Sequence, residues 1–195
     1  MRTKIIFMLI AISILLCACG SDYTIPSDTS SRTYDCDYHT LSLKTKITTK
    51  INDEEIAITG RLFTFITDPL KMTDSKGNVI ASADDSYNII SQDDHAILVD
   101  NQVEIIVKGN FEFFGESYDL YNKNGTKVGY AEFGEFGCSG EIVDTNKNLI
   151  AKFSSPPLFN DYSVTIYDND ICSDKAILLI VASYVSDYHY DKNNN

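Results

Sequence analysis

The 195-residue chain has no tryptophan, four prolines and three histidines. The histidines stand apart from one another and from any nucleophile or metal-binding motif: His39, His95 and His189. Neither H-E-x-x-H nor G-x-S-x-G occurs, so the sequence contains no recognised catalytic set and predicts neither a bound metal nor a cofactor. We therefore expect a protein that is not an enzyme. A hydrolase whose site assembles from distant residues is the alternative, because a single sequence does not align such residues.

Basic residues are also scarce. Lys and Arg number 16 against 28 Asp and Glu, which gives a net charge of −12, and no basic run occurs. A nucleic-acid-binding protein needs a basic face, so nucleic acid is excluded as a partner. Direct attraction to anionic lipid headgroups is disfavoured for the same reason.

The five cysteines are scattered: Cys17, Cys19, Cys36, Cys138 and Cys172. No C-x-x-C pair occurs, so a zinc site is not supported. The last three allow at most one disulfide, and their spacing does not say which pair would form it. Buried free thiols are the favoured interpretation.

The N-terminus resembles an export and lipidation signal. Arg2 and Lys4 precede an apolar run from Ile5 to Leu16, and the sequence then reads Leu16-Cys17-Ala18-Cys19-Gly20. This resembles the lipobox of bacterial lipoproteins, in which the cysteine after a small residue is diacylated and becomes the first residue of the mature protein. The resemblance implies a signal peptide over residues 1–18 and lipidation of Cys19 rather than Cys17. A plain secretory signal or an uncleaved anchor is the alternative.

The rest of the chain divides by composition. Residues 19–37 are polar and rich in Ser and Thr, which predicts a lipidated flexible tether that lets the domain stand off the membrane. Residues 38–190 form the predicted domain, and residues 191–195 form a tail whose composition is typical of disorder.

Short runs with period two predict β-strands. Two hairpins have clear turns, at Asn52-Asp53-Glu54 and at Asp100-Asn101. A third pattern repeats three times as a strand, a polar turn that closes on Gly or Asn, and a second strand: residues 72–81, 121–129 and 143–151. About twelve such runs, with turn signals every 8–12 residues, indicate a barrel or a sandwich. The glycines of Phe133–Gly140 predict a bulge or bend at a barrel corner.

A different pattern follows at Ala176–Val185, which is apolar on every side of a helix. Such a helix must be enclosed all round, and ten residues at roughly 1.5 Å each are too short to span a membrane. Ser173 is suited to the N-cap, and Asp174 to the first turn. We predict a central helix over about 174–188, wrapped by the strands.

The order of these elements resembles the tubby C-terminal-like superfamily, and within it the LURP-one-related and phospholipid-scramblase-like branches. The match spans roughly residues 55–190 and rests on Gly77-Asn-Val-Ile-Ala81, Gly125-Thr-Lys-Val-Gly129, Gly140-Glu-Ile-Val-Asp144, Tyr162-Ser-Val-Thr-Ile-Tyr-Asp168 and the 174–188 helix. It implies a mostly β fold, a closed barrel of about twelve short antiparallel strands around a hydrophobic C-terminal helix. Tubby proteins bind phosphoinositides through basic residues that have no counterpart here. Scramblase-like relatives are associated with calcium and lipid, but the spacing of Asp168, Asp170 and Asp174 is not that of an EF-hand.

We therefore expect an extracytoplasmic lipoprotein of the bacterial envelope, held on the membrane through a palmitate-type lipid on Cys19. Its domain is expected to be a non-catalytic binding or structural module, with a protein or envelope-polymer partner that the sequence does not identify. The alternative is a lipid-binding or lipid-handling protein of scramblase-like character, which keeps direct lipid binding open.

Overall fold

The computed structural model describes residues 23–25, 30–39, 46–60, 69–84, 95–110, 116–134, 139–156, 161–167 and 169–194, with side chains up to Ser186. The predictions for the signal peptide, for Cys19 and for Cys138 lie outside these residues.

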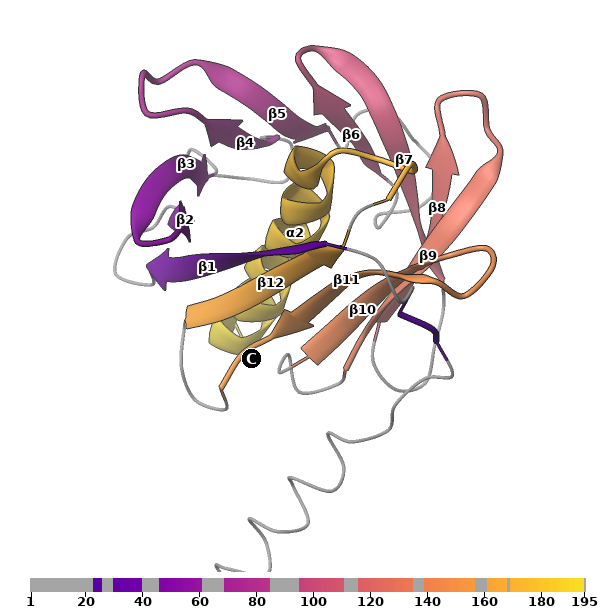
Figure 1. Ribbon diagram of the computed structural model, residues 1–195. Coiled ribbons are helices and arrows are strands. Elements are labelled where there is room, and N and C mark those ends of the chain that lie inside the picture. Colours follow the sequence, from indigo (N-terminus) through magenta and orange to yellow (C-terminus); the bar gives the residue numbers. More distant parts are fainter. Residues whose placement is uncertain are drawn as a thin grey trace, which may run out of the picture.

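Twelve strands form a closed barrel, in the order β1-β12-β11-β10-β9-β8-β7-β6-β5-β4-β3-β2 (Figure 1). Every neighbouring pair is antiparallel. The strands are β1 (Ser31–His39), β2 (Lys46–Ile51), β3 (Glu54–Gly60), β4 (Leu70–Thr73), β5 (Val79–Asp84), β6 (His95–Val99), β7 (Gln102–Asn110), β8 (Glu116–Asn122), β9 (Lys127–Phe133), β10 (Ser139–Asp144), β11 (Leu149–Ser154) and β12 (Asp161–Tyr167). The predicted fold class is confirmed.

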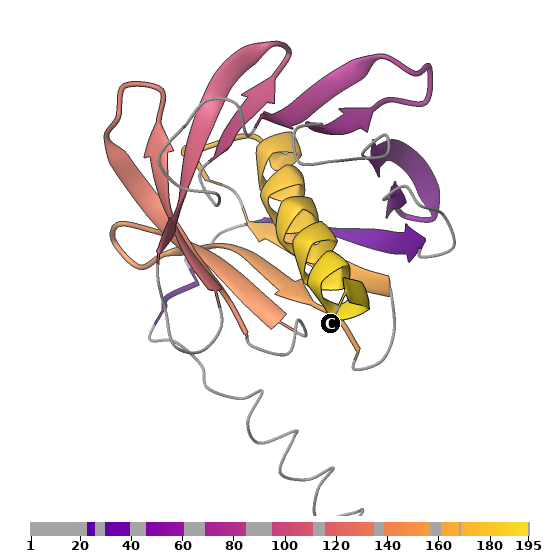
Figure 2. The same cartoon turned by 180° about the vertical axis from the view of Figure 1, so that it is seen from behind.

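The helix α2 (Asp174–Asn194) runs through the barrel (Figures 1 and 2). All residues from Ala176 to Ser186 are buried, which confirms a helix enclosed on every side. The helix continues beyond the predicted end at about residue 188, so the tail expected to be disordered is helical as far as Asn194. Extending an existing helix adds one hydrogen bond per residue without a new nucleation cost. A polar tail can therefore continue the helix, although its composition alone is typical of disorder.

The barrel also begins earlier than predicted. Their composition predicts that residues 31–37 are part of the tether, but they belong to β1, which pairs with both β12 and β2. Only Tyr34 and Cys36 of this segment turn buried side chains to the core, while most of the others face solvent. Because one face of this strand is turned to solvent, its sequence contains few apolar residues and resembles that of a linker.

The core is made by the inner wall of the barrel and the surface of α2. The largest fully buried side chains from the wall are Ile47, Leu70, Met72, Ile97, Ile105, Leu120, Ile142, Ile150, Phe153 and Ile166. They join Ile177 and Leu179 of the helix in one hydrophobic cluster. Because the helix occupies the interior, the two mouths and the outer wall are the surfaces open to a ligand.

The mouth at which α2 begins, here called the helix-start mouth, carries the tight turns. Two of them have both central residues at positive φ, Asn52 (51°) with Asp53 (65°) and Asp100 (49°) with Asn101 (64°). This is the geometry of type I′ turns, which suits the twist of hairpins. Both predicted hairpins are therefore confirmed.

Three further turns at this mouth share one geometry. The side-chain oxygen of the first residue, Asp74, Asn122 or Asp144, accepts hydrogen bonds from the amides two and four positions later. The fourth residue has positive φ in each, which glycine accepts most readily, at Gly77 (84°) and Gly125 (76°). In the third turn that residue is Lys147 (65°), not the Asn148 that the repeat suggested. Each turn is accompanied by a shift of strand register, as in a bulged hairpin.

The glycine-rich stretch lies where β9 passes into β10. The Gly134 amide donates to the Ser139 carbonyl at 2.9 Å, while residues 135–138 lie outside the described part. Gly140 has no room for a side chain, because a Cβ would lie 2.3 Å from Cδ1 of Phe133. That ring stacks on Tyr184 of the helix, with centroids 4.1 Å apart. The described ends of this stretch thus serve packing between wall and helix.

Candidate functional site

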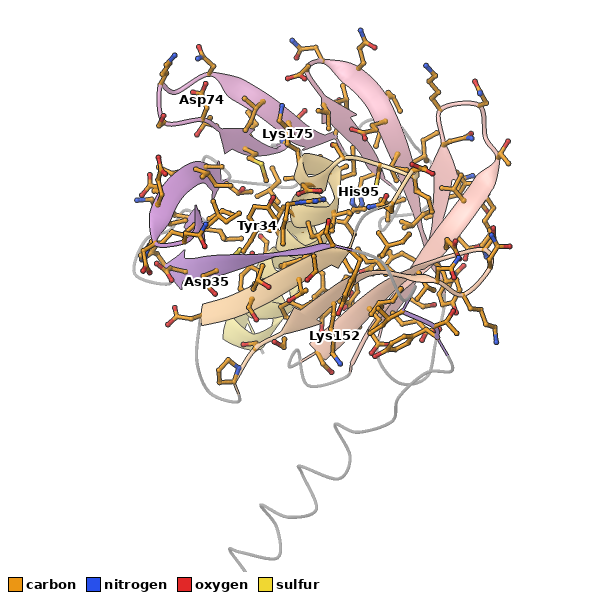
Figure 3. The ribbon with its side chains drawn as sticks, viewed as in Figure 1. Tyr34, Asp35, Asp74, His95, Lys152 and Lys175 are labelled. Carbon is orange, nitrogen blue, oxygen red and sulfur yellow. The ribbon has the colours of Figure 1, made fainter. Side chains whose placement is uncertain are left out.

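Two groups of contacts at the helix-start mouth are candidates for function. The first, here called the helix clasp, consists of Arg32, Tyr34, Glu104, Ser173 and Asp174. Arg32 donates from Nε to Oδ2 of Asp174 at 2.7 Å and from Nη2 to Oδ1 at 3.0 Å. The Tyr34 hydroxyl donates to Oδ2 of Asp174 at 2.5 Å. The first carboxylate of α2 is thereby fixed to β1, and Figure 3 shows Tyr34 beside the start of the helix.

Glu104 of β7 makes the second half of the clasp. The Ser173 amide donates to Oε1 of Glu104 at 2.5 Å, and the Ser173 hydroxyl donates to Oε2 at 3.0 Å. The same hydroxyl oxygen accepts from the Ala176 amide at 3.4 Å, so the predicted N-cap is confirmed. In the ring of twelve strands β1 and β7 are six places apart, on opposite sides. The helix start is therefore held from both sides of the barrel.

The electrostatics of the clasp favour this position of the helix. Carboxylates are stabilised at a helix N-terminus, where backbone amides point outward. Burial and the hydrogen bond to Asp174 raise the pKa of Tyr34 to about 12, so its hydroxyl keeps its proton as a donor. Both oxygens of Asp174 are engaged by Arg32 and Tyr34, and both oxygens of Glu104 by Ser173. We assign the clasp a structural role, the positioning of α2.

The described thiols are poorly suited to chemistry. Cys36 and Cys172 are free cysteines. Burial raises the pKa of both to about 12, and the charges of Glu104 and Asp174 add to the effect at Cys172. Since the thiolate is the reactive form, neither is a good nucleophile or metal ligand at neutral pH. These two thiols fit the predicted free form, and Cys138 is not described.

The histidines are spread over the fold. His39 ends β1, with Nε2 3.4 Å from the Thr48 hydroxyl oxygen. His95 opens β6 as a half-buried residue (Figure 3). His189 lies on α2. Among the described residues no group of three or more His, Cys, Asp or Glu is arranged to hold a metal ion.

The second group of contacts fastens the segment before the barrel to its wall. The Thr24 amide donates to the Lys147 carbonyl at 3.0 Å, and the Leu149 amide donates to the Thr24 carbonyl at 2.9 Å. Thr24 thus forms a parallel bridge with Asn148, beside the turn between β10 and β11. Sequence reasoning missed this contact, because one bridge between residues over a hundred positions apart has no periodic signal.

Tyr23 extends the attachment onto the outer wall. Its side chain lies beside Glu141 of β10 and Lys152 of β11, which are directly paired across the two strands. Burial first, and then the contact with Glu141, raise the pKa of Tyr23 above its ordinary value. Residues 23–25, here called the docked segment, therefore hold both the turn and the outer face of the β10–β11 hairpin.

Comparison with known proteins supports the fold. No family model and no curated protein matches the chain. Among solved structures, the X-ray structure of the Arabidopsis thaliana protein AT5G01750 is similar, with a TM-score of 0.55 and 15% identity. The similarity covers 86% of this chain and 99% of that protein. At this identity the similarity shows a related fold alone.

Among the helical residues that the structure describes, no stretch has the length and hydrophobicity required of a membrane-spanning helix.

Proposed function

We propose that this protein is a lipoprotein of the bacterial envelope, anchored outside the cytoplasm by lipid on Cys19. The observation that carries the proposal is the apolar run Ile5–Leu16 followed directly by Leu16-Cys17-Ala18-Cys19-Gly20. Two acyl chains on one residue suffice to hold a soluble domain on a membrane. The barrel that follows supplies such a domain, with its apolar residues turned to the core.

We further propose that the barrel is a non-catalytic binding or structural module. A tubby-like barrel is compatible with a binding domain. Since α2 fills the interior, its partner would bind at a mouth or on the outer wall. The absence of enzymatic activity is inferred from the sequence, in which no catalytic set is recognised.

Lipidation is tested by growing an expressing bacterium with radiolabelled palmitate. The intact protein is expected to carry label, the Cys19→Ala variant to carry none, and the matched Cys17→Ala variant to keep it. Unlabelled wild-type protein, or label that remains on Cys19→Ala, would contradict the proposal.

Lipid handling is a second candidate, favoured by one observation. Seven of the ten phenylalanines stand in the sequence between strands: Phe63, Phe65, Phe111, Phe113, Phe114, Phe136 and Phe159. Aromatic side chains are favourable at a membrane interface. Flotation of residues 21–195 on neutral and anionic liposomes, with and without calcium, tests it. Flotation without acyl chains would favour lipid handling, and failure to float in all four conditions would leave the acyl chains as the membrane contact.

A further inference from the structure

The docked segment changes how far the barrel can move from a lipid anchor. A free tether of about 17 residues, as the composition suggested, would reach several nanometres. In the structure the chain is already fastened to the wall at Tyr23 and Thr24. Only Gly20, Ser21 and Asp22 separate Cys19 from Tyr23.

The length of this connection can be compared with the size of the barrel. Four Cα-to-Cα steps of about 3.8 Å give a reach from Cys19 to Tyr23 of at most about 15 Å. The helix along the barrel has 21 residues, which at about 1.5 Å each makes it about 30 Å long. A connection half as long as the helix does not let the domain turn over freely.

We propose that the docked segment orients the barrel on the membrane, with the outer face of the β10–β11 hairpin held against the bilayer surface. This inference rests on the proposed lipidation of Cys19. The partner is the lipid surface itself, brought to this face by the anchor and not by charge, because the face pairs Glu141 with Lys152. The β4–β5 hairpin lies six places away in the ring, beyond α2, and is turned away from the lipid.

The protein provides a matched set of probe positions. The third residues of the three equivalent turns are Lys76 between β4 and β5, Asn124 between β8 and β9, and Asn146 between β10 and β11. All three are exposed, and each contributes its backbone amide to the same turn hydrogen bond. Because the chain contains no tryptophan, a single tryptophan at each position reports on that position alone.

The experiment uses the full-length lipidated protein in phosphatidylcholine vesicles that contain a nitroxide-headgroup lipid. We expect the fluorescence of Asn146→Trp to be quenched at least about threefold more than that of Lys76→Trp, since a reach of about 15 Å keeps only one wall near the lipid. Asn124→Trp, on the neighbouring hairpin, should fall between them. Equal quenching of the three variants, in protein whose mass includes the acyl chains, would overturn the orientation and leave the lipidation standing.

A change in the docked segment tests the cause. Proline at position 24 has no amide hydrogen to donate to the Lys147 carbonyl. In the Thr24→Pro background the difference between the Asn146→Trp and Lys76→Trp signals should disappear while the protein stays on the vesicles. The exposed Ile25→Ala change is the matched control and should preserve the difference. A difference that survives Thr24→Pro would refute the role of docking. Full-length protein that comes from the bacterium with no acyl chains in its mass, and that does not bind vesicles, would refute the anchor as well.

Discussion

The close approach of β9 and β10 at Gly129 gives a sharp test of the barrel wall. An alanine Cβ at this position would lie 2.3 Å from the carbonyl oxygen of Val143, where ordinary contact begins at 3.4 Å. Gly129 faces Asp144 in the ladder of the two strands. Since a backbone oxygen within a closed barrel has little freedom to move, we expect Gly129→Ala to cost about 3 kcal/mol, the upper end for overpacking. For a domain of this size that cost corresponds to a loss of roughly 6–12 °C in melting temperature.

Thermal unfolding followed by circular dichroism measures this effect, and two other glycines calibrate it. Gly134→Ala meets no atom closer than 3.5 Å and should stay within about 0.5 kcal/mol of the wild type. Gly125 has open space but a φ of 76°, so alanine there should cost about 1 kcal/mol through backbone strain alone. If Gly129→Ala and Gly134→Ala have the same melting temperature, the close pairing of β9 with β10 is wrong.

Three further predictions concern the helix, a turn and the clasp. Leu179→Ala should cost about 3–5 kcal/mol in urea unfolding, because a filled barrel cannot collapse onto the cavity, while the exposed Lys71→Ala should cost almost nothing. Burial alone would raise the pKa of Asp144, but hydrogen bonds from Asn148 and Asn146 lower it below its ordinary value. The ionised carboxylate therefore stabilises the fold above the unfolded pKa of about 3.9, and this contribution is lost as the pH falls through the lower folded pKa. In melting scans at decreasing pH, Asp144→Asn should therefore lose less melting temperature than the wild type. Asparagine is suited to this position, because Asn122 holds the equivalent place in another turn. The pKa of Tyr34, raised to about 12, supplies stabilisation that is present below the unfolded pKa of about 10 and is lost as the pH rises between the two values; Tyr34→Phe should flatten alkaline melting curves in that range, and an unchanged slope would contradict the assignment.

The fold was predictable because its strongest signals are local. The run Ala176–Val185 has no polar side, and that fact alone requires walls around it. Asn52-Asp53 and Asp100-Asn101 specify tight hairpin turns through residues that accept positive φ. The end of the helix and the start of β1 were less well predicted, since both depend on neighbours distant in sequence. At Ser31–Asp37, pairing on two sides makes a strand of a segment with little apolar content.

The site was predictable only in its cap. Ser173 and Asp174 carry the residue types that favour a helix start, and the structure uses both. Their partners, Arg32 and Glu104, lie 142 and 69 residues away and have no motif that joins them. Their roles follow from barrel closure, which places β1 and β7 opposite each other, and single-sequence patterns do not contain that information.

The side chains at the helix-start mouth serve mainly to hold the fold together. At the helix-start mouth the side-chain bonds of Asp74, Asn122 and Asp144 close turns within five residues, and the clasp fixes the helix. The side chains at this mouth make hydrogen bonds within the protein. Substitutions that alter binding there would therefore also lower the stability of the fold. With the interior filled, the exposed positions of the outer wall away from the β10–β11 face are the first in which to seek variants that alter binding without lowering the melting temperature.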